Sequence, residues 1–138
     1  MPAKDKVHDI VKNALINDGW TITHDPYSMK LGSADLFVDL GAEKLIAAEK
    51  GNAKIAVEVK SFLGKSIISE TQDAIGQFLM YQVVMSEFEA NRVLYLAIEE
   101  EIFDNEFSDA LKTLLLEKLN IKLLIFRASE EGIVKWLT

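Results

Sequence analysis

The sequence predicts an α/β fold in which a mixed β-sheet, an antiparallel hairpin plus parallel strands, is flanked by helices. Helical and strand-like patterns alternate along the chain, which is typical of parallel strands joined by helical crossovers. The dipeptide Gly51-Asn52 separates two strand-like runs, as in a β-hairpin. Residues 93–98 and 121–126 are nearly continuous apolar runs, which favours buried central strands.

Length and composition indicate one soluble domain. The 138 residues can bury a core without disulfides or a structural metal, so we expect a single domain over residues 1–138. The chain has no cysteine, which excludes disulfides, thiolate zinc sites and thiol catalysis and favours the cytoplasm. Charges are spread through the N-terminus, so we expect no signal peptide and no membrane contact. A net charge of −7 counts against a broad basic surface for DNA phosphates.

The N-terminal part predicts a helix and then short strands. Apolar residues at helical spacing predict a helix over residues 4–18. The alternating residues 20–24 predict a strand, residues 27–33 look irregular, and renewed alternation predicts a strand over residues 34–40.

Residues 43–50 and 54–60 are the predicted strands of the hairpin. Apolar residues alternate along the second strand, so Glu58 and Lys60 both point to its other face, two residues apart. A two-residue turn pairs Glu58 with Leu45. A carboxylate and an ammonium then stand side by side on one strand.

A second helix follows the hairpin. Ser69 and Gln72 form a capping-box pattern at its start, and its apolar stripe continues to about residue 90. Gln77 and Tyr81 lie one turn apart on a neighbouring face, so both could reach the same site.

The C-terminal part alternates between helix and strand. The acidic residues 99–106 predict a loop, and apolar spacing predicts a helix over residues 107–119 before the strand 121–126. The apolar residues 132–138 form or cover a sheet edge, at which a homo-oligomer could also assemble.

Carboxylates are the best candidates for chemistry in this chain. G-x-S-x-G and the glycine-rich phosphate loops are missing, which counts against serine hydrolases and nucleotide binding. Asp39 and Glu58 could hold Mg²⁺ or Mn²⁺, because these ions take one or two carboxylates together with water and phosphate oxygens. The metal would activate water for attack on a phosphodiester, and Lys60 would orient that water or stabilise the developing charge.

The first metal carboxylate is either Asp39 or Glu43. The two-residue turn places Glu43 opposite Lys60, so Asp39 reaches the site only through a bend at Gly41. His8 lies at the edge of the apolar face of the first helix, and it is either a further ligand or a hydrogen-bonded residue of the core edge.

Two motifs resemble those of a nuclease superfamily. Asp39 with Glu58-Val59-Lys60 resembles the D…E-x-K signature of the PD-(D/E)xK superfamily, which has the restriction-endonuclease-like fold, although Val38 replaces the proline that names it. The run from Gln77 to Tyr81 resembles the Q-x-x-x-Y motif of the RecB-like branch. The resemblance implies metal ligands Asp39 and Glu58, the catalytic amine Lys60, the supporting residues Gln77 and Tyr81, and a match of His8 to a histidine on the first helix of some RecB-like nucleases.

The chain as a whole resembles the XisH family, the fdxN-element excision controlling factors. The stretches that carry this resemblance are MPAKD, GWTITHDP, DLGAEKLIAAEKG, IAVEVKSF, GQFLMY and LYLAI. Membership implies a role beside a site-specific recombinase in removing a DNA element, together with the companion protein XisI.

Three hypotheses follow for the function. The first is a metal-dependent nuclease acting on DNA. The second is a catalytically silent accessory factor that binds a recombinase, XisI or DNA through the same fold. In the third, Glu58 and Lys60 form a strand-end ion pair that contributes little at a surface.

Overall fold

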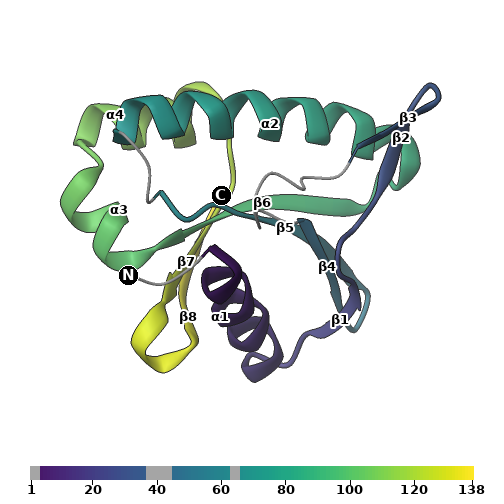
Figure 1. Ribbon diagram of the computed structural model, residues 1–138, viewed down its shortest axis with the longest axis horizontal. Coiled ribbons are helices and arrows are strands. Elements are labelled where there is room, and N and C mark those ends of the chain that lie inside the picture. Colours follow the sequence, from purple (N-terminus) through teal and green to yellow (C-terminus); the bar gives the residue numbers. More distant parts are fainter. Residues whose placement is uncertain (1–3, 37–44, 63–65) are drawn as a thin grey trace.

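A six-stranded mixed sheet flanked by helices confirms the predicted fold class (Figure 1). The structure is a computed structural model and describes residues 4–36, 45–62 and 66–138. Its elements are α1 Lys4–Asn17, β1 Thr21–His24, β2 Met29–Leu31, β3 Ala34–Leu36, β4 Leu45–Lys50, β5 Ala53–Val59, α2 Ile67–Phe88, β6 Arg92–Glu99, α3 Glu100–Glu106, α4 Asp109–Thr113, a π-helical turn Leu114–Lys118, β7 Leu123–Arg127, a 3₁₀ turn Ala128–Glu130 and β8 Gly132–Leu137. The sheet order is β1-β4-β5-β6-β7-β8, in which β5, β6 and β7 are parallel and the other neighbours are antiparallel.

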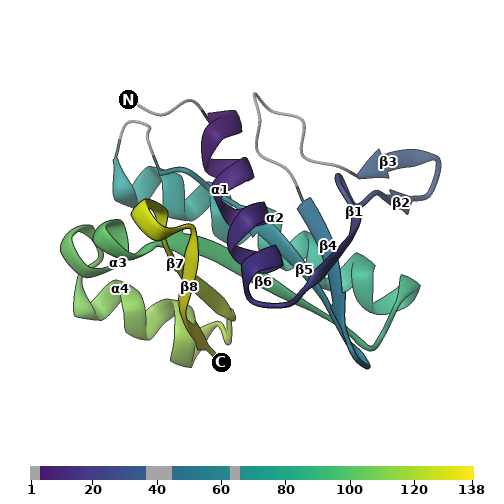
Figure 2. The same ribbon diagram turned by 90° about the horizontal axis from the view of Figure 1, so that it is seen from below.

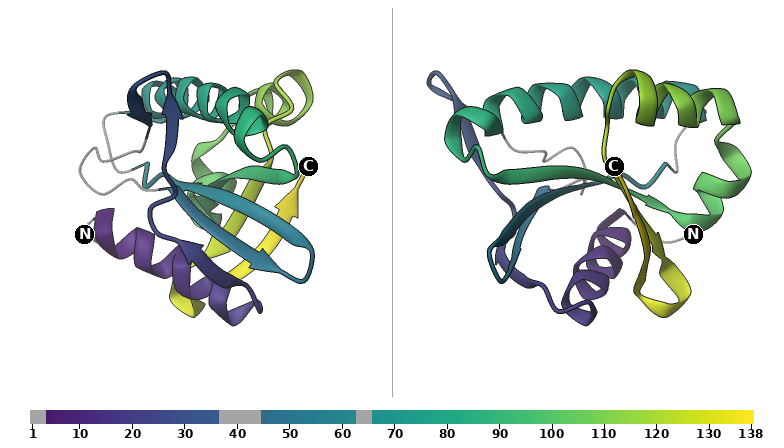
Figure 3. Two further views of the ribbon diagram at one scale, coloured as in Figure 1. Left: turned by 90° about the vertical axis from the view of Figure 1, so that its right-hand side faces the viewer. Right: turned by 180° about the vertical axis from the view of Figure 1, so that it is seen from behind.

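The helices lie on both faces of this sheet. α1 crosses one face, whereas α2 and α4 lie over the other (Figure 2; Figure 3). Val57 and Val59 of β5 pack in the cluster on the α1 side, and Ala56 packs in the cluster that contains Phe78 of α2. The predicted alternation along this strand is therefore confirmed, and Glu58 shares the α2 face with Ala56.

The hairpin forms in the predicted register. β4 and β5 are joined at Gly51 and Asn52, and Leu45 pairs with Glu58. Gly51 has a φ of +60°, the left-handed conformation that a tight hairpin turn requires and that glycine adopts without strain. The rival carboxylates Asp39 and Glu43, and the bend expected at Gly41, lie outside the described residues.

One expectation for residues 27–40 needs correction, and the other is tested only in part. β2 lies within the segment that looked irregular, and it pairs with β3 in a separate two-stranded sheet. The predicted strand 34–40 forms its first three residues in this small hairpin, and the rest of it lies outside the described part of the chain.

The start of α2 differs from the predicted capping box. The N-cap is Ser66, which has an extended backbone and whose hydroxyl accepts a hydrogen bond from the Ser69 backbone N–H at 3.1 Å. Ser69 is therefore inside the helix, and the donor that the cap satisfies is its own amide.

The acidic segment after β6 is a helix, so the prediction of a loop is wrong. Glu99 caps α3 by accepting a hydrogen bond from the Glu101 backbone N–H at 2.6 Å. Acidic residues stabilise the positive end of a helix, and Phe103 anchors this helix in the core. A charged run can thus begin a helix when one apolar side chain is buried.

The C-terminal third otherwise follows the sequence pattern. The predicted helix 107–119 is divided into α4 and the π-helical turn, with Ser108 as the N-cap. β8 pairs with β7 and is an edge strand, which is one of the two roles expected for residues 132–138. No helix in the described part of the chain is long and apolar enough to cross a membrane.

Candidate functional site

Glu58 and Lys60 are buried at the carboxyl end of β5. Their exposed fractions are 1% and 5%. Burying a carboxylate or an ammonium costs roughly several kcal/mol unless a partner of opposite charge or hydrogen bonds compensate that cost. This burial does not fit the third hypothesis, in which the two charges form a solvated surface pair.

Lys60 forms an ion pair with a residue that the sequence did not single out. Its Nζ lies 3.3 Å from Oε2 of Glu70, in the first turn of α2. A short connection separates the end of β5 from α2, so the first turn of α2 must lie near the end of this strand. That connection length, read with the crossover rule, was the signal that could have found Glu70.

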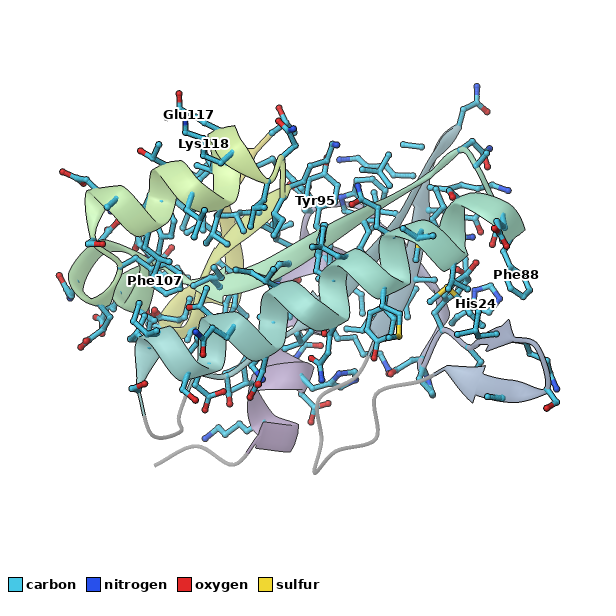
Figure 4. The ribbon with its side chains drawn as sticks, turned by 90° about the horizontal axis from the view of Figure 1, so that it is seen from above. His24, Phe88, Tyr95, Phe107, Glu117 and Lys118 are labelled. Atoms are coloured by element: carbon cyan, nitrogen blue, oxygen red, sulfur yellow. The ribbon has the colours of Figure 1, made fainter. Side chains whose placement is uncertain are left out.

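The backbone just after Lys60 has an unusual conformation at Phe62. Phe62 has a φ of +54°, a left-handed conformation that costs about 1 kcal/mol or more in a residue with a bulky side chain. Its ring packs edge-on against Phe107 at a centroid distance of 5.4 Å. Phe107 lies near the N-terminal end of α2, and Phe88 marks its other end (Figure 4). This packing fixes the position of Phe62, two residues after Lys60.

Gln77 and Tyr81 lie on the same stripe of α2 as Glu70, because they are seven and eleven residues further on. With a rise of 1.5 Å per residue, Gln77 lies about 10 Å and Tyr81 about 17 Å beyond Glu70 along the helix. α2 runs back along β5, and Glu58 lies about 7 Å before Lys60 on that strand. Glu58 is therefore closer to the level of Gln77 than to that of Tyr81.

The two α2 residues differ in their surroundings. Tyr81 is buried in the core on this face of the sheet. Gln77 has a buried side-chain oxygen that, among the described residues, accepts no hydrogen bond. A buried acceptor of this kind usually has a partner, so Gln77 is the better placed of the two to meet a ligand. The site roles of both residues stay predictions.

His8 pairs with a carboxylate on the α1 side of the sheet. Its Nε2 lies 2.9 Å from Oδ1 of Asp25, and Lys12 Nζ lies 2.9 Å from the other oxygen. Burial raises the pKa of Asp25, but hydrogen bonds from Lys12 and His8 outweigh that effect and lower it. His8 is thus a hydrogen-bonded residue at the core edge, and its role as a metal ligand stays a prediction.

A cavity opens beside Lys60, at the carboxyl ends of the parallel strands. It has a volume of about 210 Å³, and its polar lining is Lys60, Ser61, Glu99 and Glu101. Ligands of open α/β sheets bind at this edge, outside the carboxyl ends of the strands. Lys60, which is 5% exposed, therefore borders a cavity at the edge of the sheet where such ligands bind.

α3 forms one wall of this cavity, and its first turn is held in place. α3 follows β6 without an intervening residue. Arg127, the last residue of β7, donates to both carboxylate oxygens of Glu100, at 2.8 and 3.0 Å. This bidentate pair ties the first turn of α3 to the neighbouring strand.

A second charged cluster lies at the C-terminal end of α2. Arg92 donates to both oxygens of Glu89, each at 3.1 Å, and to the Ile55 carbonyl at 2.9 Å. The Tyr27 hydroxyl donates to Glu89 at 2.7 Å. Hydrogen bonds from Arg92 and Tyr27 lower the pKa of Glu89, and burial together with Glu89 raises the pKa of Tyr27 to about 12.

These features define a mixed α/β protein with a buried carboxylate and a buried amine at the carboxyl edge of its parallel strands. The family model described as XisH protein matches residues 1–134, and the chain belongs to this family.

Two solved structures are similar over nearly the whole chain. One is the crystal structure of an XisH family protein from Nostoc punctiforme PCC 73102, with 40% identity, a TM-score of 0.87, and coverage of 97% of this chain and 100% of that chain. The other is a fdxN element excision controlling factor protein from Anabaena variabilis, with 39% identity, a TM-score of 0.87, and coverage of 97% and 99%. A search of curated proteins finds no match.

Proposed function

We propose that this protein is a metal-dependent DNA phosphodiesterase of the PD-(D/E)xK type. The observation that carries the proposal is the burial of Glu58 and Lys60 at the carboxyl end of β5, where Lys60 lines a cavity. Buried ionisable groups in a cleft are candidates for a functional site, because a core gains little stability from them.

Glu58 and Asp39 would hold Mg²⁺ or Mn²⁺. The carboxylate of Glu58 offers the hard oxygen donors that these ions prefer. Within the described residues, no three acidic or histidine side chains are grouped so that they could hold an ion. The fit therefore relies on Asp39, or Glu43, together with water and phosphate oxygens. When bound, the metal supplies an activated water and offsets charge on the phosphate.

Lys60 would donate a hydrogen bond to the attacking water or to the phosphate oxygen that gains charge. An ammonium in a site that excludes most water stabilises such charge far better than it would in bulk solvent. Gln77 would support the same site from α2.

The biological setting we propose is the controlled excision of a DNA element. This follows from membership of the XisH family and from the likeness to the Anabaena variabilis excision controlling factor. The partners would be DNA, a site-specific recombinase and an XisI-like companion, and a homo-oligomer is compatible with them.

A cleavage assay tests this function. The protein is incubated with single- and double-stranded DNA, with Mg²⁺ or Mn²⁺ and with chelator. Lys60→Met and Glu58→Gln keep the shape of each side chain, and the hairpin residues Lys54→Met and Glu49→Gln are matched controls. We expect metal-dependent cleavage that only the first pair abolishes. Equal activity in all four variants would refute the site.

An accessory role is the second candidate, and a specific observation favours it. The outer face of α2 exposes four large apolar side chains: Ile68, Leu79, Met80 and Val83. Exposed apolar side chains on one helix face often mark a contact with another protein, and the net charge of −7 does not suit broad DNA binding. This role predicts no cleavage with any metal, and complex formation with the recombinase or the companion that Val83→Asp weakens.

A further inference from the structure

We propose that Glu70 positions Lys60 for catalysis. The inference rests on the proposed nuclease function. Lys60 Nζ and Glu70 Oε2 are 3.3 Å apart, and their side chains are 5% and 19% exposed. Glu70 acts through Lys60 and is a positioning residue.

Glu70 is well suited to hold a charge in place because its own backbone is fixed. It lies in the first turn of α2, and its N–H donates to the Ser66 carbonyl at 3.0 Å. The Ser66 hydroxyl caps the same turn. A carboxylate is favoured at this end of a helix, where the backbone dipoles leave partial positive charge.

Lys60 needs such a partner because its ammonium is carried on a flexible four-carbon stem. The cavity that Lys60 lines is also bordered by the carboxylates of Glu99 and Glu101, on the far side from α2. Either of these could attract the ammonium. Glu70 instead draws it toward the first turn of α2.

Glu70→Gln and Glu70→Ala test this role, and Asp73→Asn is the matched control, an exposed carboxylate on the same helix. One readout is the kcat and KM for Mg²⁺-dependent cleavage of DNA. We expect kcat to fall about 10- to 100-fold, the range for a misplaced catalytic group. KM for DNA stays the same, and Gln retains more activity than Ala because it can still accept a hydrogen bond.

The second readout is independent of catalysis. Mass spectrometry follows the acetylation of Lys60 by a succinimidyl ester, with Lys54 as the internal reference. We expect acetylation of Lys60 to be slow in the unaltered protein and in Asp73→Asn, and to accelerate several-fold in folded Glu70→Ala, with Glu70→Gln between them.

The outcomes separate the inference from the function on which it rests. Faster acetylation together with a lower kcat supports positioning by Glu70. Unchanged acetylation and unchanged kcat in the folded variants would overturn it, even if the unaltered protein cleaves DNA. No cleavage by the unaltered protein would refute the nuclease function and the catalytic role of Glu70, and faster acetylation would then reveal a purely structural ion pair.

Discussion

The two ends of α2 each carry a buried basic residue paired with a glutamate, but the pairs are built differently. At the C-terminal end, Arg92 donates three hydrogen bonds to Glu89 and a carbonyl, and Tyr27 completes the cluster. At the N-terminal end, Lys60 Nζ lies 3.3 Å from Glu70 Oε2, and Lys60 lines a cavity.

This difference separates a structural network from a candidate chemical site. A fully hydrogen-bonded cluster fixes one geometry and has little capacity for a ligand. A lysine that borders solvent can change partners, because its ammonium is a compact charge on a long stem. Neither burial nor an adjoining cavity tells the two clusters apart, because Arg92 also lines a cavity, of about 190 Å³. The difference lies in the basic group: a planar guanidinium held by three hydrogen bonds at one end, and a flexible ammonium at the other.

Loss of the arginine should have the largest effect on stability. Arg92→Ala leaves Glu89 and the Ile55 carbonyl without their shared donor, which should lower the free energy of unfolding by about 3 kcal/mol. Urea unfolding followed by circular dichroism measures the loss. A change below 1 kcal/mol would contradict the structural role, and Glu70→Ala should cost much less.

Loss of the lysine should affect chemistry more than stability. Lys60→Met keeps the apolar stem and removes the charge, so we expect DNA cleavage to fall on the order of 100-fold, about 2.7 kcal/mol in the barrier. Initial rates with Mg²⁺ measure this loss, and unfolding curves monitor the fold. If Lys60→Met lowered the free energy of unfolding but the folded variant cleaved DNA at the normal rate, Lys60 would be structural and not catalytic.

The stability that the cluster of Tyr27, Glu89 and Arg92 contributes should also depend on pH in alkaline solution. Burial and Glu89 raise the pKa of Tyr27 to about 12 in the folded protein, above its ordinary value of 10.0. A raised pKa contributes stability that is complete below pH 10 and is lost as the pH rises through 12. We expect Tyr27→Phe to cost about 1.5 kcal/mol at pH 8, where the hydroxyl donates to a carboxylate.

That cost should shrink between pH 10 and pH 12, as unfolding of both proteins across this range will show. The comparison isolates Tyr27, because burial also raises the pKa of Tyr95 and affects both proteins equally. A cost that stays constant with pH would contradict the assignment of the raised pKa to Tyr27.

The smallest effect on stability is expected for Lys54, at the exposed edge of the cluster of Tyr27, Glu89 and Arg92. Lys54 lies 3.8 Å from Glu89 and 3.9 Å from Glu49, and its side chain is partly exposed. Lys54→Met should therefore change the free energy of unfolding by less than about 0.5 kcal/mol and leave cleavage unaltered. A larger loss of stability would show that Lys54 of the hairpin contributes to the same structural network as Arg92 and Glu89.

The sequence predicted the local features of the candidate site better than its tertiary contacts. The turn dipeptide predicted the register of the hairpin. The alternation predicted that Glu58 and Lys60 share a face, because side chains along a strand alternate between its two faces. Glu70 was missed because its role depends on where a helix starts in space. α3 was missed because its acidic residues read as a loop, although Glu99 caps it and Phe103 buries it. The superfamily assignment and the role of Asp39 stay predictions.

The junction between β6 and α3 has a consequence for selectivity. No loop residue separates the two elements, and the two hydrogen bonds from Arg127 to Glu100 connect the first turn of the helix to β7. The cavity wall is thus preset, so a ligand loses little free energy in ordering it. Such a wall discriminates by size, because only a group that fits within about 210 Å³ can enter the cavity without movement of α3.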